Sequence, residues 1–200
     1  LDPHKENVLT GVNFGRGLPR TLAAPGVSVA SVGNLETYGV LTGISSEDER
    51  TEALDIFARM YAPMIGSGAV SEYLSQTGLD ALKGADILAT APQKYSSAVE
   101  YGANQFAQWL RNVAQVHLAD LGTRILYTGL NPGTFDTHAN RATVFPQLWT
   151  DVSNAVSDFY QDLKEHQATE DVVVFMFTSL AGGRGRTAPE RTTALVGWPS

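Results

Sequence analysis

The stretch "TRILYTGLNPGTFDTHANRATVFPQLW", Thr123 to Trp149, decides the fold and carries the first candidate site. Its opening run, Thr123 to Leu130, is rich in β-branched and aromatic residues, which predicts a strand. Asp136, His138 and Asn140 follow within five residues of one another, before helical periodicity begins. This order of strand, polar turn and helix predicts polar side chains at the end of a strand.

A helix and a second strand follow this turn. The segment from Phe145 to His166 repeats apolar side chains at helical spacing and predicts an amphipathic helix, whose apolar stripe consists of Leu148, Val152, Val156, Phe159 and Leu163. The run "EDVVVFMFT", Glu170 to Thr178, is almost uniformly apolar. Such a run is typical of a strand that is covered on both faces.

Helical segments dominate the chain before this stretch. A helix is predicted from about Glu47 to Tyr61, where Pro63 stops it. Helical spacing resumes at Val70, and we expect a break or bend near Gly78. The other predicted elements are an edge strand within Val8–Phe14, a strand within Gly26–Val32 and a long helix within Tyr95–Gly122.

The order of these elements predicts an α/β fold with a mainly parallel sheet covered by helices. Residues 1–178 are expected to form a single, partial α/β domain, and residues 179–200 an aberrant or flexible tail. In open α/β sheets, ligands bind beyond the carboxyl ends of the strands. The segment from Asp136 to Asn140 would lie at that edge.

Composition excludes several classes of function. The chain has 200 residues, 43% of them hydrophobic, which is enough for one domain with a sizeable core. Its formal net charge of -7 argues against nucleic acid as a partner, because phosphate binding needs clustered cations. No run approaches the ~20 apolar residues of a membrane span. Cys is absent, so any metal must use oxygen and nitrogen ligands.

Asp136 and His138 are the candidate metal ligands. Their spacing of two can direct a carboxylate and an imidazole to one cation, and this donor pair suits Zn, Mn or Fe better than Ca, with Zn or Mn expected here. The alternative is that Asp136 caps the helix starting near Thr143 or closes an Asx turn, while His138 lies in solvent. Both interpretations stay open on these residues alone.

The other histidines are weaker candidates. His117 and His166 fall in the last turns of predicted helices, where a cation interacts favourably with the helix dipole. We expect them, and His4, to be structural or solvated. Ser179 follows a predicted strand but lacks the sequence of a nucleophile elbow, so a serine hydrolase ranks third among the functions considered.

The region from Leu121 to Thr178 resembles a bacterial family of unknown function that belongs to the alkaline phosphatase/sulfatase superfamily. The resemblance rests on "DTHAN" and on the following helix, where the family shows "G-W-D-T-H-A-N-Q" and "L…L…al..F..DL". It implies an alkaline phosphatase/sulfatase-like fold, a metal site that includes Asp136 and His138, and an exported or periplasmic location.

The chain departs from this family after Thr178. The family continues with "SEFGR" and later "G-T-D-H-G", whereas this chain reads "TSLAGGRGRTAPERTTALVGWPS". A synonymous coding sequence for Arg186–Ser200, read from its third base, encodes "NGSGTDHGSGGVAF". We therefore hypothesise that the tail from about Ser179 is a frame-shifted reading, which sequencing of the encoding DNA would test. The later acid and Asp-His pair are then missing from the metal site.

Two functions follow as expectations. The first is a metal-dependent hydrolase-like domain of the phosphate- or sulfate-ester type, which acts on a small phosphorylated or sulfated substrate. Asp136 would be a metal ligand, His138 a ligand or acid/base group, and Asn140 an orienting group. The second is a non-catalytic binding or assembly domain, a degenerate or truncated relative that self-associates through exposed sheet edges.

Overall fold

The computed structural model describes residues 8–15, 17–24, 27–38, 44, 46–61, 63, 68–130, 134–135, 141–178 and 192–197. Two short 3-10 helices occur at Arg20–Leu22 (η1) and Thr169–Asp171 (η3). The strands and α-helices are β1 (Gly11–Phe14), β2 (Val29–Val32), α1 (Glu47–Tyr61), α2 (Ala69–Leu88), α3 (Ala91–Lys94), α4 (Gln105–Leu118), β3 (Ile125–Gly129), α5 (Arg141–Glu165), β4 (Val173–Thr178) and β5 (Thr192–Gly197).

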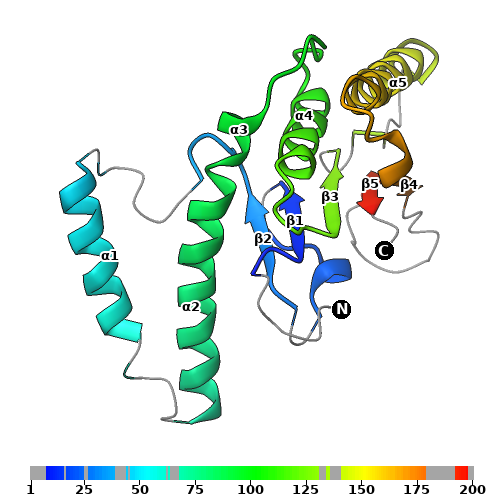
Figure 1. Cartoon of the computed structure of the whole chain (residues 1–200). Coiled ribbons are helices and arrows are strands. Elements are labelled where there is room, and N and C mark those ends of the chain that lie inside the picture. The colour runs from blue at the N-terminus through cyan, green and yellow to red at the C-terminus, as the bar shows by residue number, and fades with distance from the viewer. Residues whose placement is uncertain are drawn as a thin grey trace, which may run out of the picture.

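The strands form one mixed sheet in the order β2-β1-β3-β5-β4. Strand β1 pairs in parallel with both β2 and β3, so the carboxyl ends of these three strands lie at one edge (Figure 1). Strand β5 runs antiparallel between β3 and β4. The α/β class is therefore confirmed, although the sheet is mixed and not mainly parallel, because β5 is antiparallel to both of its neighbours.

Strand β1 is central, although the sequence suggested an edge strand. All four of its residues are buried, and Gly11 lies between Val29 on one neighbour and Ile125 on the other. A side chain at Gly11 would meet the Val29 Cγ2 at 3.1 Å, so the small residue allows close approach. The edge strand of this half of the sheet is β2.

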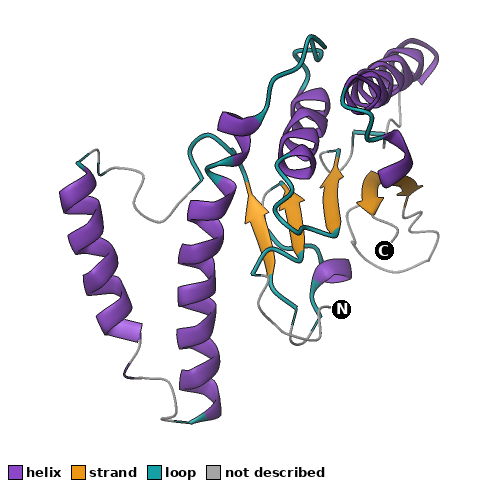
Figure 2. Ribbon diagram, in the orientation of Figure 1, coloured by secondary structure: helices purple, strands orange, loops and turns teal. Residues whose placement is uncertain are grey.

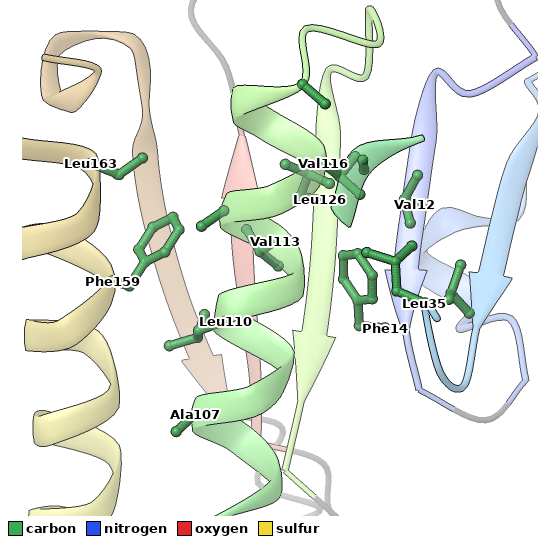
Figure 3. Close-up of a cluster of buried hydrophobic side chains, with 14 of the residues drawn as sticks. Val12, Phe14, Leu35, Ala107, Leu110, Val113, Val116, Leu126, Phe159 and Leu163 are labelled. Atoms are coloured by element: carbon green, nitrogen blue, oxygen red, sulfur yellow. The ribbon is translucent and has the colours of Figure 1, made fainter. Parts of the chain in front are cut away.

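The core lies around α4, which packs against the sheet and, at its side, against α5 (Figure 3). Ala107 and Val113 of α4 are fully buried, and Phe159 of α5 is 1% exposed. The core also takes in Val12 and Phe14 of β1. Helix α4 thus contacts both the sheet and α5, and α5 also lies against β4.

Helix α4 begins ten residues later than Tyr95, where the sequence pattern suggested that it would start. The Asn104 side chain caps it by accepting a hydrogen bond from the Ala107 amide at 2.9 Å. Residues before the cap form an extended loop instead. Val99, which falls within the range predicted for this helix, lies in that loop.

Helix α2 continues through Gly78 without the expected break. A Cβ at Gly78 would lie 2.8 Å from the Cε1 of Tyr61, so the glycine makes room for the last aromatic ring of α1. Helices α1 and α2 project beyond the sheet (Figure 2). Tyr73 and Met60 are accordingly 70% and 65% exposed.

No helix in the described ranges is both long and apolar enough to cross a bilayer.

Strand β4 is not covered on both faces, which corrects the interpretation of its apolar run. Val173 is 57% exposed and Phe175 is 59% exposed. Val174 and Met176 line a groove of about 560 Å³ against α5. A uniformly apolar sequence shows that a strand would be stable when buried on both faces. Whether both faces are covered depends on other segments of the chain, and in β4 they are not.

Phe159 and Tyr160 offer a matched test of the core. Replacing Phe159 with Ala should lower the free energy of unfolding by about 3–5 kcal/mol, because a large buried ring is lost and a cavity remains. Tyr160→Ala, at a residue that is 55% exposed, should change it by less than about 0.5 kcal/mol. Urea unfolding measures both, and equal effects would contradict the assigned helix face.

Candidate functional site

The predicted ligands Asp136 and His138, and also Asn140, lie outside the described residues. The described residues that flank them pack together on α5. Phe135 lies edge-on against Phe145, with ring centroids 5.5 Å apart, and contacts Trp149 at 5.1 Å. The chain therefore leaves β3 at its carboxyl end and is attached to the first turns of α5 directly before Asp136.

A second polar cluster, which the sequence did not indicate, lies near the other end of α5. Asp162 is 0% exposed, and its Oδ2 accepts hydrogen bonds from the hydroxyls of Tyr95 at 2.6 Å and Tyr101 at 2.7 Å. Both tyrosines belong to the segment between α3 and α4, whose course Figure 1 shows. A buried carboxylate needs such donors, because it has lost its hydration.

His166 completes the cluster. Its Nδ1 lies 2.9 Å from the main-chain oxygen of Asp162 and 3.3 Å from the Asp162 Oδ1. Its Nε2 lies 2.9 Å from the main-chain oxygen of Ser96. The Asp162 Oδ1 has no hydrogen-bond partner among the described residues. The nearby imidazole therefore stabilises it by its charge and not by an aligned hydrogen bond. The Tyr95 ring stacks beside the imidazole with centroids 6.3 Å apart.

We call residues Tyr95–Tyr101 the strap, because three side chains at the end of α5, the last of them directly after the helix, hold them. Asp162, Glu165 and His166 have i, i+3 and i+4 spacing, which places them on one helix face. Both carboxylate oxygens of Glu165 accept the Ala98 amide hydrogen at 3.1 Å. The strap is thus fixed to the last turns of α5 along most of its length.

A cleft of about 570 Å³ lies between the strap and α4. Its lining from α4 consists of Gln108 and Arg111, and the strap contributes the rest. The Arg111 guanidinium carbon lies 6.0 Å from the centre of the Tyr95 ring. Arg111 has no ion-pair partner among the described residues. The volume falls within the range of small-molecule sites.

The electrostatics of the cluster favour a positioning role. Burial, followed by the hydrogen bond to Asp162, raises the pKa of Tyr95 to about 12. The same causes raise the pKa of Tyr101 well above its ordinary value of 10.0. Both phenols are therefore protonated near neutral pH and act as donors, not as bases or nucleophiles.

The pKa values of the two described histidines are shifted in opposite directions. Main-chain hydrogen bonding with Asp162 raises the pKa of His166 above 6.5. Burial lowers the pKa of His117, and this outweighs the nearby Asp171 and Asp120. The expectation of a favourable cation at the end of a helix therefore fails for His117, because desolvation dominates there.

One sequence signal could have revealed this cluster. Asp162 interrupts the apolar stripe of α5 between Phe159 and Leu163, both of which are buried. A charged residue in a buried stripe must find donors elsewhere in the fold. The sequence could not show which residues supply them.

Comparison with protein-family models, with curated proteins and with solved structures gave no match. Within the described ranges, no three His, Asp or Glu side chains are grouped as a cation site. Function must therefore be inferred from the geometry of the chain and from its sequence motifs.

The tyrosine pKa values predict a loss of stability at high pH. The contribution of the Tyr95 hydroxyl to stability is complete below about pH 10, the ordinary pKa of tyrosine in the unfolded chain. This contribution is lost as pH rises through about 12, the pKa of Tyr95 in the folded protein. Phenolate absorbance of the folded protein should show Tyr95 and Tyr101 ionising later than in the urea-unfolded chain. The delayed signal should shrink in Tyr95→Phe; an unchanged titration curve would contradict the assignment.

Proposed function

We propose that this chain is a metal-dependent hydrolase-like domain of the phosphate- or sulfate-ester type, with an alkaline phosphatase/sulfatase-like arrangement. Asp136 and His138 bind the cation, and Asn140 orients the ester. The observation that carries the proposal is the position of this segment. It connects the carboxyl end of β3 to the first turn of α5, where α/β sheets bind ligands.

The packing of Phe135 supports a defined starting point for this segment. Its ring contacts Phe145 and Trp149, which lie on successive turns of α5. A ligand that directly follows an anchored aromatic residue costs less ordering entropy than one in a free loop. The carboxyl ends of β1 and β2 lie at the same edge and offer further positions for substrate contacts.

The donor chemistry fits Zn or Mn, because a carboxylate and a neutral imidazole are ligands that both cations accept. A catalytic zinc normally has three protein ligands and one open position. Asp136 and His138 supply two of them. When bound, the cation would polarise the ester and lower the pKa of a coordinated water. His138 is the residue that could instead exchange a proton with the leaving oxygen.

Metal binding and hydrolysis test this proposal directly. Asp136→Ala and His138→Ala should each weaken Zn or Mn binding by at least about 100-fold, and should abolish hydrolysis of nitrophenyl phosphate or sulfate. Asp151→Ala is the matched control, because this carboxylate on α5 bonds Gln147, one turn earlier on the same helix. Metal binding that is absent in the wild type, or equal in all variants, would refute the proposal.

A second candidate function is a non-catalytic assembly domain, and the exposure of β4 favours it. Strand β4 ends the sheet, so one of its edges has no strand partner in the described part of the chain. Four of its consecutive side chains, from Val173 to Met176, are at least 40% exposed. An apolar edge strand of this kind pairs readily with a second copy.

Self-association through β4 has its own test. Phe175→Lys should raise the dissociation constant of a dimer by at least about tenfold, because a charge would be buried at the new interface. Met60→Lys, at an exposed position on α1, should leave it unchanged. Sedimentation over a range of protein concentrations measures both variants. A wild-type chain that stays monomeric would exclude this function.

A further inference from the structure

We propose that one proton on the His166 imidazole fastens the strap to α5, and that loss of this proton loosens the strap and alters the cleft beneath it. This device lies apart from the proposed ester site. Asp162 is 21 residues along α5 from Arg141, or about 30 Å at the rise of an α-helix.

The hydrogen-bond geometry requires the proton. Each ring nitrogen of His166 faces a main-chain oxygen at 2.9 Å, one on Asp162 and one on Ser96. A carbonyl oxygen only accepts, so both nitrogens must donate, and only the imidazolium has two N–H groups. In the neutral ring, one of the two contacts would set a nitrogen lone pair against an oxygen lone pair.

The charges around the ring agree with this requirement. From α5, the Asp162 and Glu165 carboxylates both favour the imidazolium. Asp158, on the same helix, raises the pKa of Tyr101 by its charge. From α4, the Arg111 guanidinium carbon lies 6.0 Å from the centre of the Tyr95 ring, and its charge lowers the pKa of Tyr95. The His166 side chain is 27% exposed, so a proton can leave without unfolding the helix.

The strap keeps some of its attachments when the proton leaves. The hydroxyls of Tyr95 and Tyr101 still donate to Asp162. The hydrogen bond from the Ala98 amide to Glu165, two residues beyond Ser96, opens more often because the neighbouring attachment is lost. The one N–H that remains on the neutral ring stays at Nδ1, which faces the main-chain oxygen of Asp162 and lies 3.3 Å from its carboxylate. The hydrogen bond from Nε2 to Ser96, which lies between the other attachments, is therefore the one lost. The expected change is therefore local, within the strap residues that line the cleft, and α4 and α5 stay packed.

The direction of the pH effect follows from the raised pKa of His166. The contribution of the proton to strap stability is complete below about pH 6.5, the ordinary value, and is lost as pH rises through the higher folded value. The cleft is thus fully formed in mildly acidic solution. Near the folded pKa, a small change in pH alters the fraction of molecules with a fastened strap.

Amide hydrogen exchange at Ala98, corrected for the intrinsic rate at each pH, tests the device. In the wild type, protection should fall about tenfold between about pH 5.5 and about pH 8.5, the effect of one charge-assisted hydrogen bond. His166→Gln should be weakly protected at both pH values, since it has a single donor group and no charge. His166→Arg should be protected at both.

A control and a second measurement keep the result interpretable. His117→Gln should retain the wild-type pH dependence, because His117 lies outside the strap. The imidazole chemical shifts of the folded wild type should give a His166 pKa above 6.5, and Asp162→Asn should lower it. Wild-type protection that is independent of pH, or a pH dependence retained in His166→Gln, would overturn the proposal.

Discussion

The buried carboxylate of Asp162 is the constraint on which this part of the structure depends. Its side chain has no exposure to solvent and sits beside the core residues Phe159 and Leu163. The desolvation of such a group costs several kcal/mol unless donors replace the lost water. Two tyrosine hydroxyls and the His166 imidazole meet that need. The loop before α4 consequently packs against the end of α5 and does not continue α4 toward its amino terminus.

The need of Asp162 for distant donors explains why sequence patterns predict some helix and strand limits correctly and others wrongly. Helix α1 matches its predicted limits at Glu47 and Tyr61, and β3 lies within the predicted strand, because local periodicity and a proline decide those limits. The predicted start of α4 at Tyr95 is wrong, since Tyr95 bonds a residue 67 positions away. No local signal can report a partner so distant in sequence.

The candidate sites show the same division. The motif with Asp136 and His138 can be recognised in the sequence because its residues lie close together along the chain, and it remains a prediction. The Asp162 cluster is formed by residues from two segments and becomes visible only after folding. The exposure of β4 was also hidden, because apolarity indicates a preference for burial while the covering layer must come from other segments.

Helix α5 connects these features without making them one site. Its first turns hold Phe135 beside the predicted ligands, its middle contributes Phe159 to the core, and its last turns hold the strap. The two ends are about 30 Å apart, so neither can contact a ligand bound at the other. A packed helix transmits an effect over such a distance only if it has two discrete arrangements. Because α5 packs on the core through buried residues such as Phe159 and Leu163, we expect the proton on His166 to affect the strap and to leave the proposed ester site unchanged.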